Sequence, residues 1–194
     1  QRLIALFEAE AAANNVYPLD NRDPRRVLAM SPYQLALSNL PRHYYPDTET
    51  ASPIVVGPQV ADRDFQLVCR FQCGAQAEGV LFAIGDNMNG LAAFVIEGQL
   101  HLVFNAGHTV KRLLTTPLSA GRHVLELDHR ASGQRRGTGQ WTLDGQSVGE
   151  LDMSPTFLRV AGEGIDVGLD RKRKVSALYE GRGLFAFNGQ IDHV

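Results

Sequence analysis

Short stretches in which apolar and polar residues alternate recur from about residue 63 to the last residue. They include DFQLVCRF, GLAAFVIEG, RHVLELDHR and GIDVGLD, and turn-forming groups such as Asn-Ala-Gly, Glu-Gly and Asp-Gly separate them. An apolar residue at every second position is typical of a strand with one buried face. About ten such strands, with almost no helical period between them, predict a mainly β fold, an antiparallel β-sandwich over residues 63–194.

Two hairpins in this region are especially well marked. In VIEGQLHLVF and WTLDGQSVGEL, alternating strands are joined by the two-residue pairs Glu97-Gly98 and Asp144-Gly145. Such pairs favour the tight turns whose twist matches that of the flanking strands. Both stretches therefore predict antiparallel neighbours in a sheet.

The first 62 residues have a different character. Apolar residues at helical spacing, among them Leu3 and Phe7, predict an amphipathic helix over residues 1–15 with a stop at Asn14-Asn15. Residues 16–62 contain seven of the nine prolines, which leaves little room for regular structure. We expect a Pro-rich tether packed on the sandwich, anchored by the aromatic phrase HYYPDTE.

Charge and cysteine content limit the classes of partner and compartment. The 194-residue chain has a formal net charge of -2 and no apolar run long enough to span a bilayer, so we expect neither nucleic acid nor a membrane as partner. Cys69 and Cys73 would lie about 13 Å apart on one strand, too far for a disulfide. Free thiols favour a reducing compartment, so we predict a cytoplasmic location and leave the periplasm as the alternative.

Two carboxylate pairs suggest glycosidase chemistry at first sight. Glu126 with Asp128, and Glu150 with Asp152, match the start of the E-x-D-x-x-E strand signature of jelly-roll glycosidases. The final Glu is missing from both, and a retaining site needs its second carboxylate about 5 Å away. We therefore interpret both pairs as the polar faces of half-buried strands and predict no catalytic residues.

The sequence also contains no clear pattern for a metal site or a polyanion site. The six histidines form no H-x-H or H-E-x-x-H pattern, and in the turn GDNMNG Met88 occupies a position where calcium needs an oxygen ligand. Asp166 and Asp170 are a second calcium alternative, at a sandwich edge. We predict no metal site, and we interpret the basic segments 130–136 and 171–174 as solvated loops.

Three side chains remain as candidate contacts for a carbohydrate. Trp141 is the only tryptophan and is typical of a sandwich core, although an exposed tryptophan would stack on a sugar ring. Tyr179 and His101 are the other two candidates. Leu3 and Phe7 on the predicted helix are candidates for an interface with another domain.

The order of several phrases resembles the C-terminal portion of bacterial arylsulfatases. The phrases are LFEAEAAANNVYPLD, HYYPDTE, AEGVLFAIGD, PLSAGRHVLEL, LDGQSVGEL, IDVGLD and LFAFNGQIDHV, and together they cover nearly the whole chain. In those proteins a last helix leaves the catalytic domain, and a concanavalin A-like or laminin-G-like sandwich, a jelly roll, closes the chain. Asp47 departs from the glycine expected after Tyr-Tyr-Pro, and residues 130–137 are more basic than the usual loop.

The resemblance implies a parent enzyme that hydrolyses sulfate esters with formylglycine and calcium. The C/S-x-P-x-R motif that yields formylglycine is absent here, since neither Cys69 nor Cys73 has a proline two residues later. No cofactor is therefore expected in this chain, and the helix is expected to continue from a catalytic domain.

The leading hypothesis is a non-catalytic accessory domain that packs on the catalytic domain of the same polypeptide and shapes substrate access or supports homo-oligomers. A carbohydrate-binding, lectin-like module is the alternative. A self-sufficient hydrolase using Glu126 and Glu150 is the weakest of the three hypotheses.

Overall fold

The computed structural model describes residues 2–16, 39–46, 57–107, 109–157 and 163–194. The chain divides into two units, residues 1–37 and 38–194. In the first unit, helix α1 spans Arg2–Ala13, and no described helix is long and apolar enough to cross a bilayer. The Val16 amide donates to the Ala11 carbonyl at 2.9 Å, and Asn15 has a φ of 53°. This left-handed residue ends the helix in a Schellman-type motif, so the predicted stop at Asn14-Asn15 is confirmed.

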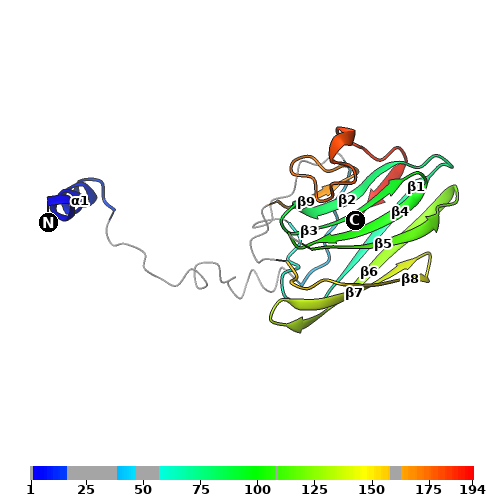
Figure 1. Cartoon of the computed structure of the whole chain (residues 1–194), viewed down its shortest axis with the longest axis horizontal. Helices are drawn as coiled ribbons and strands as arrows, with labels where there is room; N and C mark the ends of the chain where they lie inside the picture. Colours follow the sequence, from blue (N-terminus) through cyan, green and yellow to red (C-terminus); the bar gives the residue numbers. More distant parts are fainter. Residues whose placement is uncertain (1, 17–38, 47–56, 108, 158–162) are drawn as a thin grey trace. The chain divides into compact units, whose positions relative to one another are not determined.

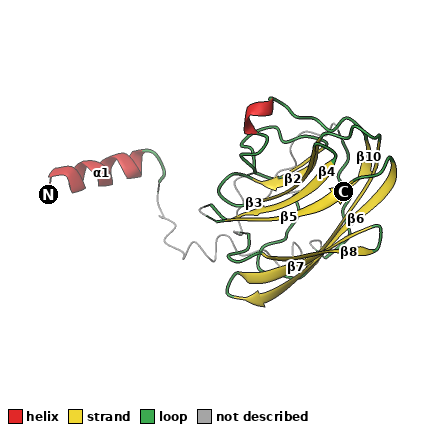
Figure 2. Cartoon of the chain, turned by 45° about the vertical axis from the view of Figure 1, so that its right-hand side comes forward, coloured by secondary structure: helices red, strands yellow, loops and turns green. Residues whose placement is uncertain are grey.

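The second unit is an antiparallel β-sandwich of two five-stranded sheets, as the alternation predicted (Figures 1 and 2). The first sheet has the order β10-β1-β6-β7-β8, with β1 at Phe65–Cys73, β6 at Gly121–Gly133, β7 at Arg136–Leu143, β8 at Gln146–Asp152 and β10 at Gln190–His193. The second has the order β5-β4-β3-β2-β9, with β2 at Gly79–Gly85, β3 at Gly90–Ile96, β4 at Gln99–Asn105, β5 at Val110–Pro117 and β9 at Ile165–Val167.

The two predicted hairpins join β3 to β4 and β7 to β8. Both residues of each turn have positive φ, with 52° and 72° at Glu97 and Gly98 and 53° and 75° at Asp144 and Gly145. These angles belong to the type I′ turn, which fits the right-handed twist of the paired strands. The hairpin prediction is therefore confirmed at both positions.

The main core lies between the two sheets and is built from the alternate positions that face inward. In β1 the inward residues are Leu67, Cys69, Phe71 and Cys73, whereas Gln66, Arg70 and Gln72 at alternate positions are exposed. Trp141 from β7 is fully buried in the same cluster. This burial matches the interpretation of Trp141 as a core residue and removes its ring from the surface.

Both cysteines are free thiols inside this core, as predicted from their spacing. Burial raises the pKa of Cys69 to about 12, and the negative charge of Asp192 adds to the shift. The Cys73 thiol lies 3.4 Å from the Ser119 carbonyl oxygen, and burial raises its pKa as well. Neither sulfur is therefore a thiolate near neutral pH, and both act as small core residues.

A loop layer covers the outer face of β2, β3 and β4. It includes the short 3-10 helix η1 at Glu180–Arg182 and packs Val175 and Tyr179 against Phe94 and Val103 in a second, smaller core (Figure 1). A buried carboxylate holds it in place, because Asp170 accepts hydrogen bonds from the Tyr179 hydroxyl at 2.7 Å and the Val175 amide at 2.8 Å. This part of the sheet face is consequently closed to a ligand.

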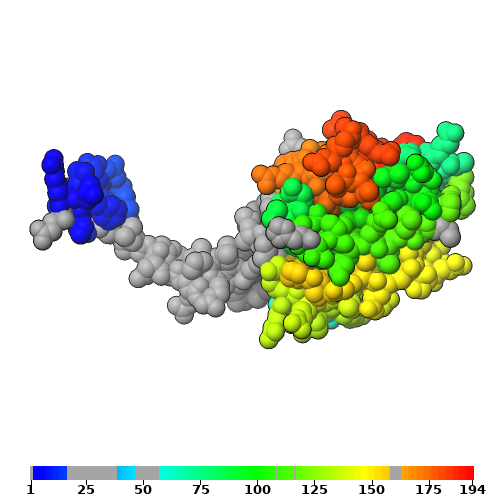
Figure 3. Space-filling model, viewed as in Figure 1, coloured from blue at the N-terminus to red at the C-terminus, as the bar shows by residue number. Residues whose placement is uncertain are grey.

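The two edges of the sandwich differ. At one edge β5 of the second sheet lies beside β8 of the first, and Lys111 forms an ion pair with Asp152 at 3.6 Å (Figure 3). At the other edge, formed by β9 and β10, residues 39–44 and 58–60 line a hollow together with residues of β1. The Tyr44 amide and carbonyl pair with the carbonyl and amide of Val194 at 2.8 and 2.9 Å. The aromatic phrase HYYPDTE is thus anchored at Tyr44, while its residues 47–49 lie outside the described range.

Candidate functional site

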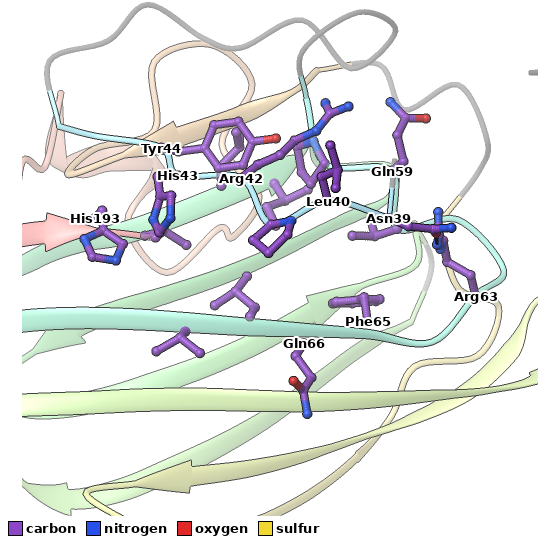
Figure 4. A pocket seen from close by; sticks show the side chains of 18 of the residues that line it. Asn39, Leu40, Arg42, His43, Tyr44, Gln59, Arg63, Phe65, Gln66 and His193 are labelled. Carbon is purple, nitrogen blue, oxygen red and sulfur yellow. Dashed lines mark hydrogen bonds between the residues drawn. The ribbon is translucent and has the colours of Figure 1, made fainter. Parts of the chain in front are cut away.

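One hollow among the described residues of the sandwich unit lies at the edge formed by β9 and β10. We call it the β1 groove: a cavity of about 490 Å³ lined by residues 39–44 and 58–60, by residues of β1, and by Ile165 of β9 and His193 of β10 (Figure 4). Its size falls in the range typical of sites for small molecules, roughly 300–1,000 Å³.

Backbone and side-chain hydrogen bonds hold the outer wall of this groove. Arg42 donates to the Gly57 carbonyl at 3.0 Å, which ties the two passes of the Pro-rich segment together. Arg63 donates to the side-chain carbonyl of Asn39, which fixes the start of the same segment. With the Tyr44–Val194 pairing, these contacts give residues 39–44 a defined position although they form no regular element.

The lining of the groove combines an apolar floor with a cationic rim. The floor includes Leu67, Ile84 and Ile165, whose side chains are at most 8% exposed. The rim carries the cationic or titratable side chains Arg42, His43, Arg63, Arg70 and His193.

Asp64, the one acidic side chain of the described lining, already has protein partners. It accepts a hydrogen bond from the Ala131 amide at 2.8 Å and lies 3.5 Å from the Arg130 guanidinium. The Ala131 hydrogen bond, together with Arg130, holds the pKa of this exposed carboxyl below its usual value. Asp64 is therefore an anion oriented by structural partners.

An aromatic and imidazole cluster stands at the β10 end of the groove. The rings of His43 and His193 meet edge to face with centroids 4.7 Å apart, and Tyr45 lies 6.0 Å from His193. Tyr45 is 55% exposed, so its ring presents a surface to solvent. The described lining contains no Ser, Thr or Cys side chain that these imidazoles could activate as a nucleophile.

The side chains proposed from sequence as ligand contacts lie elsewhere. Trp141 and Tyr179 are 0% exposed and His101 is 8% exposed, because each fills a core position that the strand alternation or the loop layer covers. None of the three lines the β1 groove. On helix α1, Leu3 is 80% exposed and Phe7 is 50% exposed.

The two carboxylate pairs lie on the outer face of the first sheet. Glu126 accepts a hydrogen bond from Thr142 at 3.1 Å, and Gln140 donates to Glu150 on the adjacent strand. Asp128 pairs with Arg130 at 2.8 Å, and Asp152 pairs with Lys111. These contacts with neighbouring polar side chains agree with the interpretation of both pairs as the polar faces of strands.

The calcium alternatives are engaged in other contacts. Asp86 of GDNMNG accepts the amides of Met88 and Asn89 at 2.8 and 3.1 Å and so closes its own turn. Asp166 pairs with Arg171 at 3.1 Å, and Asp170 binds Tyr179. Among the residues that the structure describes, no three His, Cys, Asp or Glu side chains are placed to hold a metal.

Two buried imidazoles lack a partner on one ring nitrogen. His129 donates from Nδ1 to the Arg63 carbonyl at 3.0 Å, and its Nε2 has no hydrogen-bond partner. His101 stacks on Phe94 with ring centroids 5.0 Å apart, and its Nδ1 is likewise unpartnered. Burial lowers the pKa of both groups; Arg112 lowers that of His101 further, whereas nearby carboxylates oppose both shifts.

We predict that the free energy of unfolding falls as the pH drops below about 6.5, the ordinary pKa of histidine. In that window the unfolded chain binds protons at positions 101 and 129 that the folded chain excludes, so stability rises with pH. Urea unfolding at pH 7.5, 6.5 and 5.5 measures this, and His101→Phe, which keeps the stack on Phe94, should make the dependence shallower. An unchanged slope in the variant would exclude His101 as a source.

Sequence reasoning missed the β1 groove and its three arginines. Arg70 occupies an outward position of a predicted strand, a signal shared by many solvated arginines. Arg42 lies in the Pro-rich segment, where no periodicity indicates which strand it faces. The pairing of Tyr44 with Val194 helps to bring these residues together, and no local pattern predicts it.

Comparison with known proteins gives structural likeness alone. No protein-family model matches the chain, and no curated protein matches it. Similar solved structures include domains LG4-5 of the mouse laminin alpha1 chain, with 16% identity over 70% of this chain and 38% of that chain and a TM-score of 0.49. Another is an endo-1,3-beta-glucanase from Streptomyces sioyaensis, with 10% identity over 61% of this chain and 54% of that chain and a TM-score of 0.39. The chain spans less than two thirds of either structure.

Proposed function

We propose that this chain is a non-catalytic accessory domain that packs on the catalytic domain of a sulfatase-type hydrolase in the same polypeptide. The observation that carries the proposal is the apolar surface of helix α1, where Leu3, Ile4 and Leu6 are 80%, 66% and 57% exposed. A helix with such side chains gains stability when another surface covers them. The phrases that resemble the C-terminal portion of bacterial arylsulfatases supply the class of the partner.

The state of the described carboxylates supports a non-catalytic role. Glu126 and Glu150 are exposed on a flat sheet face and bound to neutral side chains, whereas a catalytic acid or base sits in a cleft that tunes its pKa. The hydrolysis of sulfate esters, with formylglycine and calcium, belongs in this proposal to the catalytic domain. The sandwich then shapes access to that site or supports oligomers.

Hydrogen exchange tests the packing of the helix. We expect the amides of residues 2–13 to exchange faster in this chain alone than in a longer polypeptide that also contains the residues encoded upstream of Gln1. Leu3→Asp in the longer polypeptide should restore fast exchange, because a buried carboxylate opposes docking. Leu184→Asp, at a 66% exposed leucine of the sandwich, is the matched control and should change nothing. Equal exchange in both polypeptides would refute the proposal.

Activity measurements test the non-catalytic part. The chain alone should show no turnover of 4-nitrophenyl sulfate or of aryl glycosides, and Glu126→Gln should leave this result unchanged. Turnover that is lost in Glu126→Gln would replace the proposal with a self-sufficient hydrolase.

The lectin-like alternative has less support from the structure of this chain. Its proposed contacts Trp141 and Tyr179 are buried, so neither ring is available to stack on a sugar. A glycan array with neutral and sulfated sugars distinguishes the two roles, since specific retention of one sugar class would favour the alternative.

A further inference from the structure

We propose that His43 and His193 together bind one divalent transition-metal ion, with Cu²⁺ preferred, through a nitrogen of each imidazole. The ion joins the segment 39–44 to strand β10 at one end of the β1 groove. This site is separate from helix α1 and from the carboxylates considered above for calcium. It therefore does not depend on the accessory role proposed for the domain.

Backbone pairing places the two imidazoles on one side of a two-stranded ribbon. Tyr44 and Val194 exchange both of their backbone hydrogen bonds, as residues directly opposite each other in an antiparallel pair do. Tyr45 therefore stands opposite His193, and His43 shares the side of Tyr45 because side chains two apart point the same way. Figure 4 shows His43 and His193 side by side at this end of the groove.

The separation of the two rings fits a pair of imidazoles that share one ion. Their centroids are 4.7 Å apart and their planes make an angle of 76°. An ion about 2.0–2.1 Å from a nitrogen of each ring lies roughly 3 Å from each centroid, so an angle of about 90–110° at the ion gives centroids roughly 4.5–5.2 Å apart. Rotation about the Cβ–Cγ bond, which has a broad energy well, aims one nitrogen of each ring at the ion without moving the backbone.

Both imidazoles have nitrogens available to a ligand. His43 is exposed and His193 is half-buried, and neither has a hydrogen-bond partner among the described residues. The other described histidines differ, because His123 uses both ring nitrogens in hydrogen bonds and His101 and His129 are buried. In the part of the chain that the structure describes, an accessible pair of imidazoles is thus found at this position.

Two imidazoles with water in the remaining positions favour Cu²⁺. Imidazole suits copper, nickel and zinc, and a given site binds Cu²⁺ more tightly than Ni²⁺ or Zn²⁺. Structural zinc sites take four protein ligands and catalytic ones three, so two are too few for a typical zinc site. The tetragonal geometry of Cu²⁺ accepts two nitrogens at about 90°. Calcium and magnesium prefer oxygen ligands and are excluded by the donor type.

Two charged neighbours act on the pair in opposite directions. Arg70 lies opposite His193 in the register of β1 and β10, and its positive charge opposes a bound cation. Asp192, the exposed residue before His193, favours one. We therefore expect Arg70→Gln to tighten the binding of Cu²⁺ a few-fold and Asp192→Asn to weaken it.

Titration of the full chain with Cu²⁺ at pH 7.5, followed by amide NMR, tests the proposal. We expect one ion per chain, with paramagnetic broadening first at residues 43–45 and 192–194. Ni²⁺ and Zn²⁺ should act on the same amides with lower affinity. Hydrogen exchange of the Tyr44 and Val194 amides should slow when the ion is bound, because the ion links the two segments that carry them.

Variants distinguish one shared ion from two separate sites. His43→Gln and His193→Gln should each weaken the binding of Cu²⁺ at least about tenfold, since even the loss of an outer-shell partner reaches that size. The double variant should be little weaker than either single variant, because either change already breaks the pair. Tyr45→Phe is the matched control: it keeps the ring 6.0 Å from His193, removes the phenol oxygen and should leave the affinity unchanged.

Several results would overturn the proposal. A site of unchanged affinity in either single histidine variant would show that each imidazole binds an ion by itself. An equal loss in Tyr45→Phe would assign the ion to the phenol oxygen. Broadening that begins at residues 1–4 would assign it to the amino terminus of the chain. Broadening that persists in the double variant would show an adventitious ion only.

Discussion

Replacing Leu102 by alanine is expected to lower the free energy of unfolding by about 2–5 kcal/mol. Leu102 lies on β4, is 0% exposed and belongs to the core between the two sheets. The substitution removes buried methyl groups and leaves a cavity that neighbours from both sheets cannot fill without moving. Urea unfolding followed by circular dichroism measures the change through the midpoint and the slope.

The matched control for this prediction is Leu184→Ala. Leu184 is 66% exposed in the loop after η1, so the same chemical change there should alter stability by no more than about 0.5 kcal/mol. Equal stability of Leu102→Ala and Leu184→Ala would show that Leu102 of β4 does not pack in the core as described.

Replacing Gly79 by alanine is expected to cost about 3 kcal/mol or more, through two effects at one position. Gly79 has a φ of +111°, which L side chains rarely adopt. A Cβ there would lie 2.3 Å from the Ala186 carbonyl oxygen and 2.5 Å from the Phe187 Cα. This backbone is held against β2 by the Val80 amide, which donates to the Phe185 carbonyl at 3.0 Å, so it cannot move away cheaply.

Two further glycines separate the two effects. Gly121 has a φ of +145°, and a Cβ at this position would meet no atom within 4 Å. Gly121→Ala should therefore lower the free energy of unfolding only through backbone strain, by about 1–3 kcal/mol. Gly74 has neither constraint, and Gly74→Ala should be neutral within about 0.5 kcal/mol. Thermal and urea unfolding of the three variants should rank them in this order. A Gly79→Ala variant as stable as Gly121→Ala would contradict the close approach of residues 185–187 to β2.

The features predicted correctly from sequence are those set by neighbouring residues. The strand alternation in FQLVCRFQC produced the observed burial of Leu67, Cys69, Phe71 and Cys73, because side chains two apart share one face of a strand. The Glu97-Gly98 turn could also be predicted, because its φ angles depend on the two turn residues and on the twist of the adjoining strands. Asn15 ended the helix by its own left-handed conformation.

The features missed from sequence depend on contacts between distant segments. Tyr179 is buried because the loop that carries it closes over β2–β4, and its hydroxyl donates a hydrogen bond to Asp170. The residue type alone does not indicate whether such a ring is buried or exposed. His101 was proposed as a ligand contact, yet stacking on Phe94 of the next strand encloses its ring. Propensity and periodicity describe one segment at a time and say nothing about which segment covers it.

By itself the sequence determined an antiparallel sandwich after a helix and a Pro-rich segment, with two free thiols. Burial periodicity, turn chemistry and cysteine spacing are local properties of a polypeptide, so they can be read along the chain. Only the tertiary structure decided that Tyr44 pairs with Val194 and that Arg42 shares a groove with Arg70. The physical reason is that this edge closes through backbone hydrogen bonds between residues 150 positions apart, and such pairings depend on how the whole sheet is assembled.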